Sequence, residues 1–430
     1  MLMKKLLCII IIIFISSRCS QLVKKPTWYK GNLHTHTLWS DGDAPPETVV
    51  NWYKQNGYDF LALSDHNILS EGEKWIDVAD SANEELWPPP FTKDKLELLK
   101  DEFGDSWPVL RYKGDTLQMR LKTLAELKDT FEKPDEFILI QAEEITDEFD
   151  NFPVHVNASN IQSLINPQGG NSAFEVMQRN IDAVEEQSRI TQQPILAHVN
   201  HPNFEWGIVA EDLMYLNGDP FFEVYNGHPG VKNWGDDSHP GTDRIWDIVL
   251  ANRLVRNMST FFGVATDDAH SYYRSGVGNS NAGRGWVMVN TNILKHENII
   301  NALENGDFFS SAGVSLENIT VTKDQMKVTI HAEPGITYTT KFIGTLKNVD
   351  TSSTEIINEH EQPIHVSRIY SNEIGQVLFE TNKNPAVYLF THDELYVRAK
   401  IISDQKHPNP YAEGDFEMAW TQPVVFAKDD

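Results

Sequence analysis

Short apolar runs that end in histidine, aspartate, glutamate or asparagine recur through residues 27–312, and a segment with helical spacing or a loop follows each run. Strands that alternate with helices favour a largely parallel sheet or barrel. Polar residues at the carboxyl ends of such strands are what an active site at the mouth of a βα-barrel needs. The runs are DFLALSDHN (59–67), EFILIQAEEIT (136–146), FPVHVNA (152–158), PILAHVNHP (194–202), FFEVYNG (221–227), FFGVATDDAH (261–270) and the shorter VMV (287–289).

The segments between these runs predict helices. Residues 45–56 begin with paired prolines and end before Gly57, which suits a helix start and a helix stop. Apolar residues at helical spacing predict further helices in 116–132, 173–192, 241–253 and 295–305.

Two regions depart from this pattern. Residues 68–112 are acidic and polar, and WPPP (87–90) interrupts regular structure, so we expect an insertion after the second strand that covers the barrel mouth. From 314 to 430, short β-like runs such as KVTIHAE and LYVRAKII alternate with turn residues. A chain of 430 residues is too long for one ordinary core. We therefore expect an α/β domain at 27–312, followed by a small all-β, sandwich-like domain at 314–430.

The first twenty residues, MLMKKLLCIIIIIFISSRCS, combine two lysines with a short apolar core. The core is too short to span a bilayer comfortably, so residues 1–19 predict a signal peptide and export. The sequence around Cys19 resembles a bacterial lipobox, although Arg18 stands where a small residue is usual. We expect an exported bacterial protein that is periplasmic or anchored as a lipoprotein through Cys19, with a retained membrane anchor as the alternative.

Composition limits both the partners and the kind of metal site. The chain has 62 acidic and 36 basic residues, and its net charge of -26 opposes binding to nucleic acid or anionic membranes. Its two cysteines, Cys8 and Cys19, both lie in the N-terminal segment, so the folded body has no thiolate site. Any metal ion must therefore be held by histidine, aspartate and glutamate.

The stretch HTHTLWSDG places His34, His36 and Asp41 close together in the sequence. In an extended segment residues i and i+2 point to the same side, so the two imidazoles project together. Asp41 lies in a turn from which its carboxylate can reach back. Two imidazoles on one face make half of a metal site. Alone the motif is a weak signal, because most His-x-His pairs are accidental.

The argument for a metal site comes from the accumulation of such clusters at the ends of apolar runs. A buried carboxylate or imidazole is costly unless it is paired or bound to metal, so packing alone does not explain the pattern. The further candidates are Asp65 and His66 in SDH, Glu143 and Glu144 in AEEIT, His155 in PVHVN, His198 and His201 in LAHVNHP, and Asp267, Asp268 and His270 in TDDAH.

The ordered set of motifs resembles the polymerase-and-histidinol-phosphatase (PHP) family of metal-dependent hydrolases. That family's pattern of HxHxxxSDG, DH, an isolated Glu, a lone His, a His near proline and DxH reads here HTHTLWSDG, SDH, EEIT, VHV, HVNHP and DAH. The resemblance covers roughly residues 27–312 and implies a distorted (β/α)7 barrel with one to three metal ions. The signal peptide, the ending AWTQPVVF, and NHPNF, EVYNG and TDDAH are similar to an exported branch that includes carbaryl hydrolase.

The resemblance also implies a ligand set for two or three divalent ions, and nitrogen and oxygen ligands fit manganese, iron or zinc. His34, His36, Glu144 and Asp268 would hold the first ion, Glu144 would bridge to a second held by His155 and His201, and Asp41, His66 and His270 would hold a third. Glu143 remains an alternative to Glu144, and His198 an alternative to His201.

Other residues have more open roles. His198 and Asp267 are candidate catalytic residues that protonate the leaving group, although Asp267 also suits a supporting role beside the ligands. Asp65 is expected to orient His66 or a strand neighbour. The remaining candidates are either substrate contacts or structural residues: Glu223, Tyr225, Asn226, His228, Arg274 and Arg284.

These features together predict an exported metal-dependent hydrolase that uses a metal-bound hydroxide, acting most readily on a phosphoester. The alternative substrate is a carboxyl ester, amide or carbamate, as the carbaryl-hydrolase likeness suggests. The substrate would be a small-molecule or glycan-linked ester, and the charge and export signal oppose a nucleic-acid role. A contrasting hypothesis is a non-catalytic surface binding lipoprotein. Against it, no ligand position of the pattern is lost. No sequence feature indicates the oligomeric state.

Overall fold

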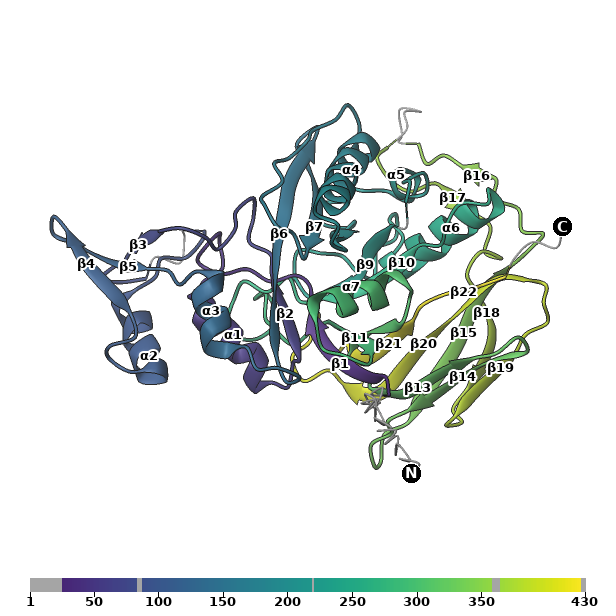
Figure 1. The fold of residues 1–430 in the computed structure, drawn as a ribbon. Helices are drawn as coiled ribbons and strands as arrows, with labels where there is room; N and C mark the ends of the chain where they lie inside the picture. The colour runs from purple at the N-terminus through teal and green to yellow at the C-terminus, as the bar shows by residue number, and fades with distance from the viewer. Residues whose placement is uncertain (1–24, 83–86, 219, 358–363, 427–430) are drawn as a thin grey trace, which may run out of the picture.

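The computed structural model describes residues 25–82, 87–218, 220–357 and 364–426, so the predicted signal peptide and Cys19 lie outside the described residues. One large sheet contains both parallel and antiparallel pairs, and three smaller sheets are antiparallel. The expectation of a mixed α/β chain with a β-rich C-terminal part is confirmed (Figure 1). Among the described helices, none has both the length and the hydropathy needed to cross a bilayer.

Seven strands or the loops that follow them carry the predicted site residues, with Glu144 in the middle of β6 and His155 in the first half of β7. The seven strands are hydrogen-bonded in the order β10-β9-β8-β7-β6-β2-β1. Neighbours pair in parallel except for β7, which is antiparallel to both β6 and β8. The strands are β1 (Thr27–Asn32), β2 (Phe60–Leu63), β6 (Ile138–Phe149), β7 (Phe152–Ser159), β8 (Leu196–Val199), β9 (Phe221–Asn226) and β10 (Phe262–Thr266).

The antiparallel strand β7 has a local cause in the sequence. Asp150 and Asn151 separate β6 from β7 and have φ angles of 52° and 63°. A two-residue loop with both φ angles positive turns the chain back as a hairpin, and aspartate and asparagine tolerate that conformation. The expectation of a largely parallel arrangement therefore fails at β7, and it also fails at β11 (Trp286–Thr291) and β12 (Phe308–Ala312), which pair antiparallel with their neighbours.

The backbone segments that follow β1 and β10 meet at the carboxyl ends of the strands. Thr35 and Ala269 form a parallel bridge. The His36 amide donates to the Ala269 carbonyl and the Asp268 amide donates to the His34 carbonyl, each at 3.0 Å. The two ends of the strand order are thus joined at the level of the predicted ligands, while a fully closed barrel remains a prediction.

Helices follow most of the strands, as expected. The segment 116–132 is an exception, because its first part is β5 (Thr116–Arg120), which pairs with strands on both sides. A helix begins only after Thr123, which forms a capping box with Glu126. The helices are α1 (Pro46–Gln55), α2 (Lys93–Phe103), α3 (Leu124–Phe131), α4 (Ala173–Thr191), α5 (Ala210–Leu213), α6 (Thr242–Val255) and α7 (His296–Glu304).

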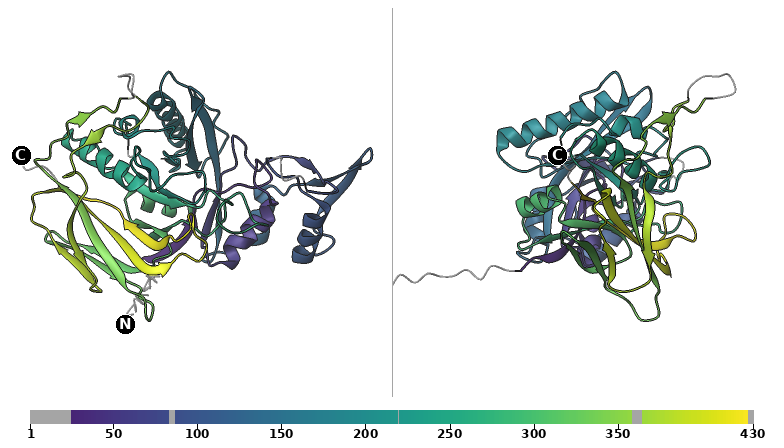
Figure 2. Two further views of the ribbon diagram at one scale, coloured as in Figure 1. Left: turned by 180° about the vertical axis from the view of Figure 1, so that it is seen from behind. Right: turned by 90° about the vertical axis from the view of Figure 1, so that its right-hand side faces the viewer.

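A small sheet of β3 (Trp75–Asp77), β4 (Val109–Lys113) and β5 stands out from the body together with α2 (Figures 1 and 2). Strand β3, helix α2 and nearly all of β4 belong to the predicted insertion 68–112, whereas β5 follows it. The apolar core of the small sheet also contains Leu38 and Trp39 from the loop after β1. The outlying sheet therefore packs against the loop that carries Asp41.

The C-terminal strands extend the large sheet in the order β11-β12-β21-β20-β15-β18, and a second sheet, β13-β14-β19, shares a core with them. Two sheets over one core give the sandwich-like arrangement of this part. The strands are β11 (Trp286–Thr291), β12 (Phe308–Ala312), β13 (Leu316–Val321), β14 (Gln325–Ile330), β15 (Tyr338–Leu346), β16 (Ser353–Thr354), β17 (Ile369–Tyr370), β18 (Gln376–Thr381), β19 (Ala386–Leu389), β20 (Glu394–Lys406), β21 (Phe416–Thr421) and β22 (Val424–Val425).

Candidate metal centre

His34 and His36 follow β1 in the extended segment that the sequence predicts, and their side chains point to the same side. Their Nε2 atoms lie 3.1 Å apart. Glu144 Oε2 lies 3.3 Å from each of these nitrogens, and Asp268 Oδ1 lies 3.4 Å from His34 Nε2 and 3.2 Å from His36 Nε2. Ligand atoms bound tetrahedrally at about 2.0–2.1 Å from an ion lie about 3.4 Å from one another. These separations therefore suit a shared metal ion.

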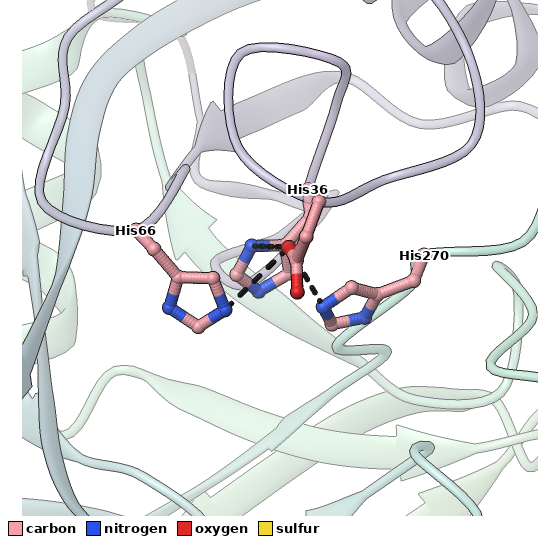
Figure 3. A group of neighbouring side chains, drawn as sticks. His36, His66 and His270 are labelled. Atoms are coloured by element: carbon pink, nitrogen blue, oxygen red, sulfur yellow. Dashed lines mark ion pairs between the residues drawn. The ribbon is translucent and has the colours of Figure 1, made fainter. Parts of the chain in front are cut away.

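A second cluster surrounds Asp41. Its Oδ1 atom lies 3.3 Å from His270 Nε2, 3.5 Å from His66 Nε2 and 3.7 Å from His36 Nδ1. Figure 3 shows the three imidazoles converging, with the ion pairs drawn as dashed lines. Among the described residues, Asp41 Oδ1 is buried without a hydrogen-bond donor. A buried carboxylate oxygen without a donor is costly, and a cation would compensate it.

Asp65 fixes the turn from which Asp41 reaches this cluster. Its carboxylate accepts hydrogen bonds from the backbone and hydroxyl groups of Thr37 and Ser40. Gly42 closes the same turn, where a Cβ atom would lie 2.7 Å from the carbonyl carbon of His36. Of the two expected roles of Asp65, the structure favours contact with a strand neighbour, because Asp65 orients the turn that follows β1 and precedes Asp41.

Glu144 lies between the predicted first and second ion positions. Its Oε1 lies 2.8 Å from His155 Nδ1 and 3.3 Å from His201 Nε2, whereas its Oε2 lies 2.9 Å from His66 Nδ1. With His34 and His36, five histidines face this one carboxylate. Such a carboxylate, with each oxygen facing a different set of imidazoles, is suited to bridging two ions.

Glu143 points away from the cluster, because successive residues of a strand face opposite sides. Its Oε1 accepts a hydrogen bond of 2.7 Å from the backbone amide of Ile165. Of the two glutamates considered as metal ligands, Glu144 is therefore the one whose side chain faces the histidines.

Several carboxylates and imidazoles of the cluster shift one another's pKa values toward the charged forms. Burial acts to lower the pKa of His34, but Asp268, Glu144 and Glu223 outweigh it and raise that pKa well above its usual value. Burial likewise acts against ionised Glu144, but His66 and His34 hold the Glu144 pKa well below its usual value. Burial would lower the pKa of His66, yet Glu144 and Asp41 raise it to about 11. In the metal-free site some histidines therefore carry protons that an ion must displace.

Metal uptake at pH 7 is accordingly expected to release protons and to weaken as the pH falls, since a histidine binds metal only when neutral. Titration calorimetry with zinc or manganese in buffers of different ionisation enthalpy measures the number of protons released. An observed binding enthalpy that is the same in all buffers would contradict the protonated metal-free site.

Glu223, left open between a substrate contact and a structural role, lies behind the ligands. This fully buried carboxylate accepts hydrogen bonds of 2.7 Å at Oε1 from the Thr266 hydroxyl and the His34 Nδ1 group. At Oε2 it accepts from the His201 backbone amide and the Asn226 amide group, each at 2.7 Å. A carboxylate that accepts from the far nitrogen of a ligating histidine fixes its tautomer and orientation.

Glu223→Gln is expected to weaken metal affinity about 10- to 100-fold, because the amide group replaces an acceptor where only donors approach. Competition with a chromogenic chelator measures that affinity. Glu148→Gln, at the exposed end of β6, is a matched control that should leave it unchanged. Equal affinities of the two variants would show that Glu223 does not support the metal ligands.

The two predicted proton donors do not reach the cavity. His198 is fully buried and its Nε2 lies 3.5 Å from Glu223 Oε1. Asp267 is also fully buried and accepts hydrogen bonds from the Tyr53 hydroxyl and from the backbone amides of 283–285. Strand ends present side chains to both the cavity and the core, and these two face the core. Their placement corrects the assignment of direct proton transfer and makes Asp267 an anchor of the loop 283–285.

A cavity of about 670 Å³ opens over the cluster. Seven of the nine predicted ligands line it, and the fully buried His34 and His36 do not. Arg274 also lines it, whereas Arg284 is fully buried and donates to the carbonyls of Gly227 and Asn279. Arg274 thus lies at the wall of the cavity, whereas Arg284 stabilises the loops around it.

Two solved structures show a distant likeness to this chain. No family model matches the chain, and no curated protein matches it. A two-domain protein from Bacteroides vulgatus, described as containing a predicted PHP-like metal-dependent phosphoesterase, is 13% identical with a TM-score of 0.37. The match covers 93% of this chain and 96% of that one. A candidate metal-dependent phosphoesterase from Bifidobacterium adolescentis is 12% identical with a TM-score of 0.28, covering 65% and 96% respectively. Because both likenesses are so distant, inference about function rests on the motifs and the site geometry.

Proposed function

We propose that this protein is a metal-dependent hydrolase of the PHP family that acts on a phosphoester. The observation that carries the proposal is the position of Glu144, whose two oxygens face five histidines beside an open cavity. Structural ion pairs rarely gather so many imidazoles around one buried carboxylate, because each buried polar group adds a desolvation cost.

The residues present fit divalent ions. Glu144 Oε2 and Asp41 Oδ1 are buried without hydrogen-bond donors among the described residues, and both lie within 4 Å of several imidazole nitrogens. Nitrogen and oxygen donors suit manganese, iron or zinc. The nine residues proposed to hold two or three ions are His34, His36, Asp41, His66, Glu144, His155, His201, Asp268 and His270.

A divalent ion at this position would make a bound water more acidic and polarise an ester oxygen. The protein itself supplies the orientation of the site: Glu223 holds His34, and Asp65 holds the turn that carries Asp41. Arg274 lines the cavity, and an arginine at that position favours an anionic substrate in an otherwise acidic chain. These features favour a phosphoester over a neutral carboxyl ester, amide or carbamate.

Two substrates with the same chromophore test this choice: 4-nitrophenyl phosphate and 4-nitrophenyl acetate. Purified protein is expected to hydrolyse the phosphate with a kcat/KM at least about tenfold above that for the acetate. Chelation should abolish the activity, and manganese, zinc or iron should restore it. Equal or faster turnover of the acetate would favour the carboxyl-ester alternative. Bound metal without hydrolysis of any ester would favour a non-catalytic binding protein.

The N-terminal segment supports a proposed location outside the cytoplasm, with Cys19 as a lipid anchor and a small-molecule or glycan-linked ester as substrate. Fractionation of cells that express the full chain tests the anchor. Wild-type protein is expected in the membrane fraction and Cys19→Ser protein in the soluble exported fraction. The same distribution for both proteins would exclude the lipid anchor.

A further inference from the structure

His228 lies in the loop that follows β9 and lines the cavity, yet among the described residues it belongs to no group of three or more side chains placed to hold a metal ion. Its backbone amide donates to Asn226 Oδ1 at 2.7 Å, and its carbonyl accepts from the Val231 amide at 3.1 Å. Asn226 in turn donates to Asp268 Oδ2 at 3.1 Å and to Glu223. The loop is thus tied to the same hydrogen-bond network that holds the predicted ligands.

The tautomer of His228 is set by a backbone group. The Gly230 amide donates to His228 Nδ1 at 3.0 Å. A backbone amide is only a donor, so Nδ1 must be the acceptor and the neutral ring carries its proton on Nε2. A Cβ atom at Gly230 would lie only 2.8 Å from the Phe204 ring. Because Gly230 has no side chain, its amide can approach His228 Nδ1 and fix the orientation of the imidazole.

The orientation of the ring is also restrained. It packs edge to face against Phe204, with ring centroids 5.7 Å apart, and against His270, with centroids 5.5 Å apart. The described residues offer no hydrogen-bond partner to Nε2. The ring therefore presents one oriented and unused N–H group beside the predicted ligand His270.

We propose that His228 is a catalytic residue whose Nε2–H donates a hydrogen bond to a phosphoryl oxygen of the bound substrate. The inference rests on the proposed function and adds to it a substrate contact. No proton is transferred and no bond to His228 forms. A fixed donor that costs no reorganisation stabilises charge that grows on an oxygen in the transition state, and loss of one such donor typically costs about 10²–10³-fold in kcat.

His228→Leu and His228→Gln test the donor directly, because leucine removes it and glutamine places an amide N–H at similar reach. With metal-loaded protein, His228→Leu is expected to lose about 10²–10³-fold in kcat and to bind inorganic phosphate more weakly by calorimetry. His228→Gln is expected to keep most of both. Both variants should retain the wild-type metal content. His239→Leu is the matched control, since His239 pairs with Asp236 and does not line the cavity.

The outcomes separate this inference from the proposed function. If the wild type hydrolyses a phosphoester and binds phosphate, but His228→Leu does the same, the His228 assignment alone is wrong. If His228→Leu loses its metal ions, or if glutamine rescues neither kcat nor phosphate binding, the residue is structural and the assignment is again wrong. If the metal-loaded wild type neither binds phosphate nor hydrolyses phosphoesters, the proposed function fails and His228 loses its role with it.

Discussion

Glu144→Gln is expected to remove bound metal and to lower kcat/KM for phosphoester hydrolysis by about 10³-fold or more. Glutamine keeps the size of the side chain but replaces a charged acceptor by a neutral amide, and five imidazoles face that carboxylate. Loss of metal-ion catalysis costs several kcal/mol, and each 1.36 kcal/mol corresponds to about tenfold in rate. Elemental analysis of the purified variant and steady-state kinetics at saturating metal measure the two effects.

Glu143→Gln is the matched control, because it makes the same chemical change one residue away on the opposite face of β6. Its carboxylate accepts from the Ile165 amide and meets none of the predicted ligands. We expect wild-type metal content and activity from it. Thermal unfolding of both variants in chelator checks that each is folded without metal. Loss of metal in Glu143→Gln, with retention in Glu144→Gln, would reverse the assignment.

Local sequence periodicity predicted the part of the site that depends on single strands. The i, i+2 spacing of His34 and His36 places their Nε2 atoms 3.1 Å apart, because both belong to one extended segment. The same alternation along β6 places Glu143 and Glu144 on opposite faces, although it left open which of the two faces the histidines. Both relations follow from backbone geometry alone, and neither needs knowledge of the remaining fold.

The roles of the residues around the ligands depend on contacts that sequence does not specify. Glu223 meets His34 across 189 positions of the chain, and the run that ends in EVYNG suits a substrate contact and a buried support equally. His198 and Asp267 also end apolar runs, yet their side chains point into the protein and not into the cavity. A strand end indicates proximity to the site, but the side-chain direction follows from local twist and from the loops that pack above it.

The contact between α6 and the C-terminal sheet could not be predicted from the sequence. We expect that a substitution which breaks this contact greatly lowers the stability of the fold. Arg398 on β20 is fully buried. Its guanidinium donates to Asp247 at 2.7 Å and 2.9 Å and pairs with Asp243 at 3.1 Å. Arg398→Ala is expected to lower the free energy of unfolding by about 3–5 kcal/mol, because it removes the ion-pair partner of the buried Asp247 carboxylate and leaves it, among the described residues, only the hydrogen bond from the Tyr396 hydroxyl. Urea denaturation followed by tryptophan fluorescence measures the change.

Arg368→Ala supplies the comparison, since Arg368 pairs with Glu355 at 3.2 Å in a partly exposed position. Such a pair contributes no more than about 1 kcal/mol.

Arg398→Ala also tests how the two parts of the chain unfold. If the α/β part and the β-rich part unfold together, Arg398→Ala shifts one transition to lower urea. If they unfold separately, it produces two transitions. A variant with wild-type stability and a single transition would mean that the remaining partners of Asp243 and Asp247 suffice, and that the pairs with Arg398 do not hold the two parts together.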